Sequence, residues 1–155
     1  MQKYKIILFL FSLFSAICYS QDCNYYSSLV DCRIIMHRDY KIYLHPKYTT
    51  IGINDTLTYN IVFNGKSDYV ITLCTNQKFY PINIKLLQPV TGKELFDNAK
   101  DGYIESLGIG FDNTQNIILK VVLLAKKNGK GKILKNEKAC VSLSLQCKAY
   151  SKDNE

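Results

Sequence analysis

Strict alternation of apolar and polar residues over short segments is the feature that most restricts how this chain of 155 residues can fold. Successive side chains of a β-strand point to opposite faces, so a segment that alternates in this way predicts a strand with one apolar face. The pattern is clearest in two segments, whose apolar series are Leu57, Tyr59, Ile61 and Phe63 in the first and Val141, Leu143, Leu145 and Cys147 in the second. Each segment therefore predicts a strand that buries one face.

Further β-prone segments follow one another from residue 40 onward, separated by turn signals. Eight strands are predicted, over residues 40–44, 56–63, 69–74, 82–87, 94–96, 103–111, 116–125 and 140–148. Turn pairs stand between them at residues 64–65 (Asn-Gly), 91–92 (Thr-Gly) and 128–129 (Asn-Gly), which predict antiparallel hairpins. Residues 117–124 are apolar on both faces apart from Lys120, which indicates a central strand. The predicted fold of residues 40–150 is an all-β antiparallel sandwich.

The first forty residues predict export and a short helix. Lys3 and Lys5 precede an uncharged apolar run over residues 6–17, and the small residue Ser20 stands before Gln21. This is the pattern of a cleaved signal peptide over residues 1–20, and the run is shorter than the roughly 20 residues that span a bilayer. Residues 21–39 carry an imperfect helical stripe, which predicts a short helix packed on the sandwich.

Five cysteines remain after residue 20, and an exported protein reaches a compartment where disulfides form. Cys74 and Cys140 are both out of phase with the apolar residues of their strands, so we expect them to face each other and to pair. Cys23 and Cys32 would form a second, local pair, which a regular helix through both would forbid because nine residues of helix rise about 13 Å. Cys147 is in phase with the apolar residues of its strand and is expected to be a buried thiol.

A stretch of carboxylates is the candidate metal site. Asp97, Asp101 and Asp112 lie within sixteen residues, and their oxygens could surround a calcium ion at the rim of the sandwich. The alternative is a polar loop in which Asp, Asn and Gly form turns. Calcium is the one cofactor that the sequence suggests.

A lysine-rich stretch is the candidate for an anionic partner. Lys126, Lys127, Lys130 and Lys132 lie close together in sequence and could contact a charged glycan or a lipid headgroup. The alternative is a solvated hairpin loop whose charge prevents aggregation. Nucleic acid is not expected, because no aromatic residues are interleaved with these lysines.

Several segments together suggest a family. They are DYKIYL (39–44), LTYNIVF (57–63), ITLC (71–74), KELFDN (93–98) and ACVSL (139–143). With the signal ending in Ser-Gln, they resemble small uncharacterised exported proteins of the Bacteroidota. Such proteins are similar to jelly-roll-like sandwiches that accompany secreted enzymes or receptors as non-catalytic accessory domains, so the resemblance implies no catalytic residue.

No nucleophile elbow, phosphate-binding loop or zinc-protease motif is present in the sequence, so we do not expect an enzyme. The expected function is that of an exported binding or assembly module in the periplasm or on the cell surface. Its partner would be a protein or a glycan of the envelope. The alternative is a calcium-dependent carbohydrate binder or a small hydrolase that uses residues 97–112.

Overall fold

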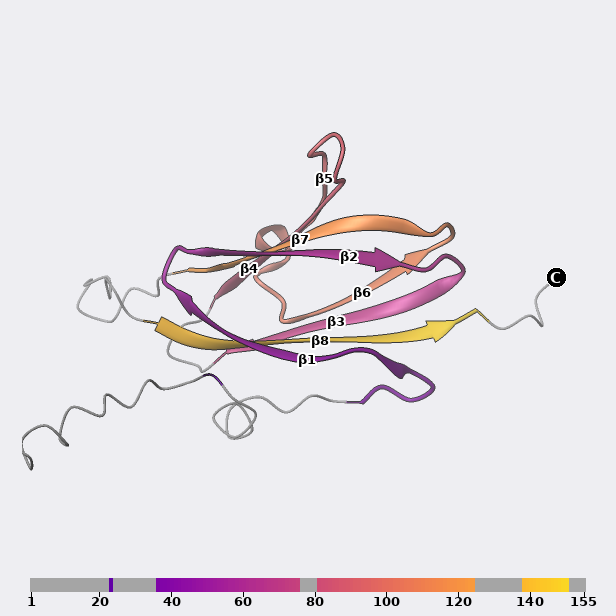
Figure 1. Ribbon diagram of the computed structural model, residues 1–155, viewed down its shortest axis with the longest axis horizontal. Helices are drawn as coiled ribbons and strands as arrows, with labels where there is room; N and C mark the ends of the chain where they lie inside the picture. Colours follow the sequence, from indigo (N-terminus) through magenta and orange to yellow (C-terminus); the bar gives the residue numbers. More distant parts are fainter. Residues whose placement is uncertain (1–22, 24–35, 76–80, 125–137, 151–155) are drawn as a thin grey trace, which may run out of the picture.

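The computed structural model describes residue 23 and residues 36–75, 81–124 and 138–150. These residues form two four-stranded antiparallel sheets packed face to face (Figure 1). The strands are β1 (Lys41–Gly52), β2 (Thr56–Phe63), β3 (Ser67–Thr75), β4 (Ile82–Leu87), β5 (Glu94–Asp97), β6 (Ser106–Phe111), β7 (Gln115–Leu123) and β8 (Lys138–Ala149). The prediction of an all-β protein with eight antiparallel strands is confirmed.

The two halves of the chain pair with each other like one long hairpin rolled into two layers. Sheet A has the order β1-β8-β3-β6 and sheet B the order β2-β7-β4-β5. The first strand therefore pairs with the last, the second with the seventh, the third with the sixth and the fourth with the fifth. As a result β1 and β2, although joined by a short turn, lie in different sheets, and each is an edge strand.

The connection between β2 and β3 differs from the predicted hairpin, because these strands belong to different sheets. Gly65 is needed in this connection because another loop approaches its backbone closely, not because of a hairpin turn. A Cβ at this position would lie 2.7 Å from the backbone oxygen of Asp112 and 2.8 Å from the backbone of Asn113. The glycine lets the two loops at this end of the sandwich approach each other closely.

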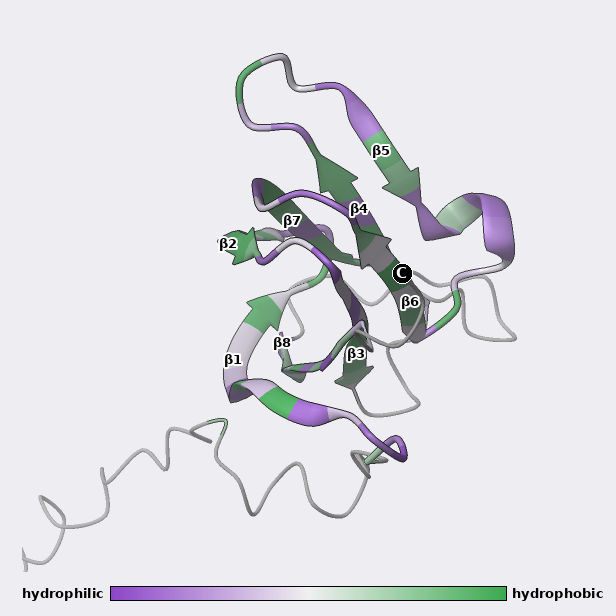
Figure 2. Cartoon of the chain, turned by 90° about the vertical axis from the view of Figure 1, so that its right-hand side faces the viewer, coloured by the Kyte–Doolittle hydropathy of each residue, from purple (hydrophilic) through white to green (hydrophobic). Residues whose placement is uncertain are grey.

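The facing surfaces of the sheets form one hydrophobic core, and the apolar stretches lie on the strands (Figure 2). An aromatic cluster fills one end of it. Phe63 of β2 stacks on Phe111 of β6 at 4.7 Å between ring centroids, and Tyr69 of β3 packs edge-on against both rings. The Tyr69 hydroxyl accepts a hydrogen bond from the backbone N–H of Asn64, and burial raises the pKa of this tyrosine. Aromatic residues from both sheets thus hold the layers together at this end.

The described residues before β1 contain no helix. Residues 38–39 form a turn, and Asp39 has a positive φ of 67°. The predicted helix over residues 21–39 is therefore wrong for residues 36–39, and residues 24–35 lie outside the described part of the chain, as does the predicted signal peptide. No helix among the described residues is long and apolar enough to cross a membrane.

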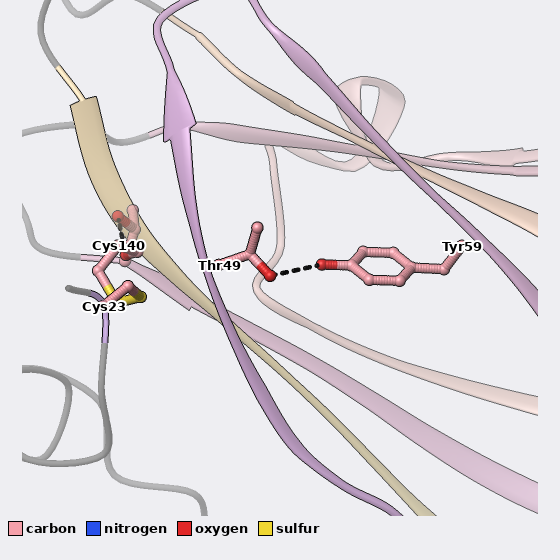
Figure 3. Close-up of a disulfide and its surroundings, with 5 residues drawn as sticks. Cys23, Thr49, Tyr59 and Cys140 are labelled. Carbon is pink, nitrogen blue, oxygen red and sulfur yellow. Dashed lines mark hydrogen bonds between the residues drawn. A yellow bond between two sulfur atoms is a disulfide. The ribbon is translucent and has the colours of Figure 1, made fainter.

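One disulfide of the structure joins Cys23 to Cys140, with Cα atoms 5.3 Å apart (Figure 3). The predicted pairs Cys74–Cys140 and Cys23–Cys32 are wrong, and Cys74 is engaged in a disulfide of its own. The register places Cys74 opposite Ser142, so Cys140 is its diagonal neighbour on β8. Diagonal neighbours lie about 7–8 Å apart, beyond the usual 4.4–6.8 Å between bonded cysteines. Cys147 is free, as predicted, but it is half-buried rather than fully buried.

The outer face of β8 is covered rather than open. Ser142, Ser144 and Gln146 alternate with the core residues of this strand, yet all three are buried. The backbone N–H of His37 donates a 2.9 Å hydrogen bond to Oε1 of Gln146, and the disulfide holds Cys23 at the far end of the same strand. The outer face of sheet A along β8 is therefore not a free binding surface.

Candidate functional site

An open groove lies between the two edge strands β1 and β2, on the side of the sandwich where the sheets separate. Its volume is about 600 Å³. The residues that line it are Tyr43, Leu44 and Lys47 of β1 and Thr58, Tyr59, Asn60, Ile61 and Val62 of β2. The groove thus presents hydroxyl, amide and ammonium groups beside apolar side chains, a mixture that suits binding.

The shape of β1 opens this groove. The register between β1 and β8 shifts between Ile42 and Leu44 and again between Leu44 and Lys47, so the strand bulges first at Tyr43 and then at residues 45–46. A proline inside a strand is tolerated at a sheet edge or a bulge, because it cannot donate to the ladder. The sequence prediction ended this strand at residue 44, before Pro46. The strand continues to Gly52 because β1 is an edge strand.

Two side-chain contacts cross the groove and fix its width. The hydroxyl of Tyr43 donates a 2.6 Å hydrogen bond to the backbone carbonyl of Val62. Further along, the hydroxyls of Thr49 and Tyr59 lie 3.4 Å apart and point toward each other (Figure 3). Tyr43 also packs edge-on against the buried Tyr69, with 5.0 Å between ring centroids. Edge strands of different sheets are thereby held apart at a set distance.

The backbone of β2 is the wall that distinguishes this groove. In an antiparallel strand the N–H and C=O of one residue point to the same side, and the side alternates along the strand. The backbone carbonyl of Val62 accepts its hydrogen bond from Tyr43 of β1. The backbone N–H and C=O of Val62 therefore point away from β7. Because the register of β2 with β7 is unbroken, the backbone groups of Thr58 and Asn60 point the same way, into the groove.

Natural edge strands usually carry features that prevent pairing with another chain, such as charges, proline, bulges or short length. β1 has lysines, Pro46 and two register shifts, and β5 has four residues with Glu94. β2 has eight residues, no charge, no proline and no bulge. Among the edge strands of the described sheets, β2 is the one longer than six residues that lacks all of these features.

Asp97, one of the predicted calcium ligands, makes several contacts within the protein. Asp97 accepts hydrogen bonds from the Asn83 side chain and from the N–H of Ala99, where it caps the 3₁₀ helix η2 (Asn98–Asp101). Its Oδ2 lies 2.7 Å from the Lys85 ammonium, which lowers the pKa of this carboxyl to about 2. These contacts fit the alternative interpretation of the sequence, a polar loop in which Asp, Asn and Gly form turns, and add an ion pair to it.

The other carboxylates of the stretch are not gathered around Asp97. Asp101 and Asp112 are exposed, and Asp112 follows β6 at the end of the sandwich where its carbonyl accepts from the N–H of Lys66. Within the ranges that the structure describes, no group of three His, Cys, Asp or Glu side chains could hold a metal ion. The lysines at 126, 127, 130 and 132 and Cys32 lie outside those ranges.

Sequence reasoning missed Asn98, the most connected polar residue of this region. It is fully buried, and its Oδ1 accepts from the N–H of Ile84 and from the Asn83 side chain. Its Nδ2 donates to the carbonyls of Ile82 and Ile104. Asn98 fastens η2 to β4. An Asp-Asn pair in a polar loop gives no signal of this burial.

The hairpin between β4 and β5 projects from the body of the sandwich (Figures 1 and 2). Its base carries ion pairs of 2.9 Å from Glu94 to Lys85 and to Lys100. Its loop is closed by a 2.9 Å bond from the N–H of Gly92 to the carbonyl of Gln88. Val90 at the tip is 92% exposed. The hairpin predicted from residues 91–92 is confirmed.

Comparison with known proteins adds little. No protein-family model matches the chain, and no curated protein sequence matches it. A solved structure with a partial likeness is that of PliG from Aeromonas hydrophila, a periplasmic lysozyme inhibitor of g-type lysozyme. The two chains are 13% identical, and the match covers 66% of this chain and 84% of that one with a TM-score of 0.47. A likeness of this extent says nothing about what the present chain binds.

Proposed function

We propose that this protein is an exported, non-enzymatic binding module with a jelly-roll fold, and that it binds an extended segment of an envelope protein by adding it as a strand to β2. The observation that carries the proposal is the free backbone edge of Thr58 and Asn60 along the groove. An exposed sheet edge that accepts an extended peptide is a recurring recognition mode, in which the main chain supplies affinity and flanking pockets supply specificity.

The size of the edge sets what it can hold. The Val62 carbonyl is already bonded to Tyr43, so the free edge runs over residues 58–61. It spans about 13 Å at about 3.3 Å per residue, which is room for a segment of about four residues. Each backbone hydrogen bond contributes only about 0.5–1.5 kcal/mol net, so the edge alone gives weak binding. Contacts with the opposite wall, formed by Tyr43, Leu44 and Lys47, would supply the rest.

Two further observations support the export part of the proposal. The chain begins with the signal-peptide pattern over residues 1–20. The Cys23–Cys140 disulfide is of the kind that persists in oxidising compartments such as the bacterial periplasm. The strand order of the two sheets, in which the halves of the chain pair as one rolled hairpin, supports the jelly-roll assignment.

A pull-down with edge variants tests the proposal. The purified protein, Asn60→Ala and Asn60→Pro are immobilised and exposed to envelope extract of the source organism, and retained proteins are identified by mass spectrometry. Asn60→Pro removes the outward N–H without removing a bond to β7, whereas Asn60→Ala removes only the side chain. Circular dichroism confirms that both variants are folded.

The expected result is a protein partner retained by the wild type and by Asn60→Ala and lost with Asn60→Pro. Equal retention by the folded Asn60→Pro variant would contradict strand addition. Retention of an envelope polysaccharide in place of a protein would contradict the assignment of the ligand as a polypeptide.

A further inference from the structure

The groove between β1 and β2 has a one-sided charge. Lys47 is the charged side chain that lines it, and no carboxylate lines it. Neither strand contains an aspartate or a glutamate along its length. Asp39, before β1, pairs with Lys148 at 3.7 Å, and Asp55 stands in the turn after β1. In the described part of the chain, Lys47 has no ion-pair partner.

The position of Lys47 places its ammonium at the mouth of the core. Lys47 pairs in register with Leu143, which is fully buried, so it belongs to the set of β1 residues that face sheet B. The next two members of that set are Thr49, which contacts Tyr59, and the buried Ile51. Lys47 itself remains exposed because β1 bulges just before it. Lys47 therefore lines the groove on the wall opposite the free edge of β2.

Resting on the proposed strand addition, we infer that the segment accepted by β2 is acidic, with a carboxylate that pairs with Lys47. An extended ligand has alternate side chains on opposite faces, so one face of it turns toward β1 and the core. A carboxylate on that face meets the ammonium, while a lysine or arginine there meets a like charge. Charge at such a position acts mainly on partner choice, by rejecting the wrong partner as much as by attracting the right one.

A second role for Lys47 makes a different prediction. Inward-pointing charges on edge strands also protect a sheet against aggregation. In that role the sign of the charge does not matter, so Lys47→Glu would protect as well as the wild type and leave ligand choice unchanged. A charge-reversal experiment therefore separates recognition from protection.

Peptide selection provides the test with a defined probe. A displayed library of random heptapeptides is selected separately on the purified wild type, on Lys47→Glu, on Lys93→Glu and on Asn60→Pro. Lys93→Glu makes the same change of net charge on the β4–β5 hairpin, outside the groove. Selected peptides are then synthesised, and their affinities are measured at low and high salt.

The expected outcome is a wild-type consensus with Asp or Glu at one position. Binding of these peptides falls at least tenfold with Lys47→Glu, stays within twofold with Lys93→Glu, and weakens as salt rises. A consensus without an acidic position, or equal binding by Lys47→Glu, overturns the inference about the acidic segment while strand addition stands. Peptides that bind Asn60→Pro as well as the wild type overturn the proposed strand addition itself.

Discussion

The hydroxyl of Tyr43 donates a 2.6 Å hydrogen bond to the backbone carbonyl of Val62, and so joins the edge strand of one sheet to that of the other. This contact shows that the backbone N–H and C=O of Val62 point away from β7, and every second residue of β2 has its backbone groups on that same side. It also satisfies one outward carbonyl and leaves Thr58 and Asn60 facing the groove. Strand addition to β2 requires this geometry, and the stability of the scaffold that presents it can be tested separately.

Substitution of the buried Asn98 should be among the most damaging single changes. Asn98→Ala removes a side chain that makes four hydrogen bonds and leaves buried backbone groups of β4 without partners. We expect the free energy of unfolding to fall by about 2–4 kcal/mol, since each unsatisfied buried group costs about 1–3 kcal/mol. Urea unfolding measures this. The exposed Asn113 is the matched control, and an equal loss with Asn113→Ala would contradict the role of Asn98.

The ion pair of Asp97 makes stability depend on pH in a defined window. The neighbouring Lys85 ammonium holds the pKa of Asp97 at about 2, below its ordinary value of 3.8. A lowered carboxyl pKa stabilises the folded state above about pH 4, and this contribution is lost as the pH falls toward 2. Asp97→Asn should therefore lower the free energy of unfolding by about 1–2 kcal/mol at pH 7 and by much less at pH 2. This is less than the whole pKa shift would give, because solvent screens the ion pair.

Chemical denaturation at both pH values measures the effect of Asp97→Asn, with the exposed Asp101→Asn as control. If Asp101→Asn destabilised the protein as strongly, or if the effect of Asp97→Asn did not depend on pH, the ion pair would not be its cause. The same pair of variants, heated with and without millimolar calcium, also tests the calcium hypothesis.

Two glycines should respond differently to replacement by alanine. Gly65→Ala places a Cβ within 2.8 Å of the backbone of the loop after β6. We therefore expect the free energy of unfolding to fall by about 1–3 kcal/mol. Nothing lies within 4 Å of a Cβ at Gly108 in β6, so Gly108→Ala should be neutral or slightly stabilising. Thermal unfolding of the two variants checks this, and a more harmful Gly108→Ala would contradict the close approach at Gly65.

The Cys23–Cys140 disulfide should be found directly by peptide mapping of the purified protein without reduction. The bond spans 117 positions, and chain entropy gives it about 4–5 kcal/mol of stabilisation. Replacing both cysteines by serine should lower the melting temperature by several degrees or more. A peptide that joins Cys74 to Cys140 would show that the pairing is different.

Local pattern predicted the strands well because period-2 alternation and turn residues act over a few positions. All eight predicted strands are present, and the one between Pro81 and Pro89 agrees at both ends. Disulfide pairing failed because it depends on register between distant segments. The alternation of apolar and polar residues places Cys74 and Cys140 on the same face of the sheet. Only the structure shows that Cys74 lies opposite Ser142 rather than Cys140.

The groove could not be predicted for the same reason. Sequence alone marks Tyr43 as a tyrosine near the end of an element and Lys47 as an ordinary lysine beyond the predicted strand. These two residues lie beside Asn60 and Val62 only because β1 and β2, which follow each other in the chain, belong to different sheets. The burial of Asn98 likewise follows from the packing of η2 against β4, which no local pattern encodes.

Amide hydrogen exchange along β2 tests the central claim most directly. In the free protein, the amides of Thr58 and Asn60 should exchange rapidly and those of Tyr59 and Ile61 slowly, because only the latter pair is bonded to β7. Addition of a selected acidic peptide should slow the exchange of Thr58 and Asn60 and leave Tyr59 and Ile61 unchanged. A peptide that binds and leaves Thr58 and Asn60 exchanging as fast as before would contradict strand addition to β2.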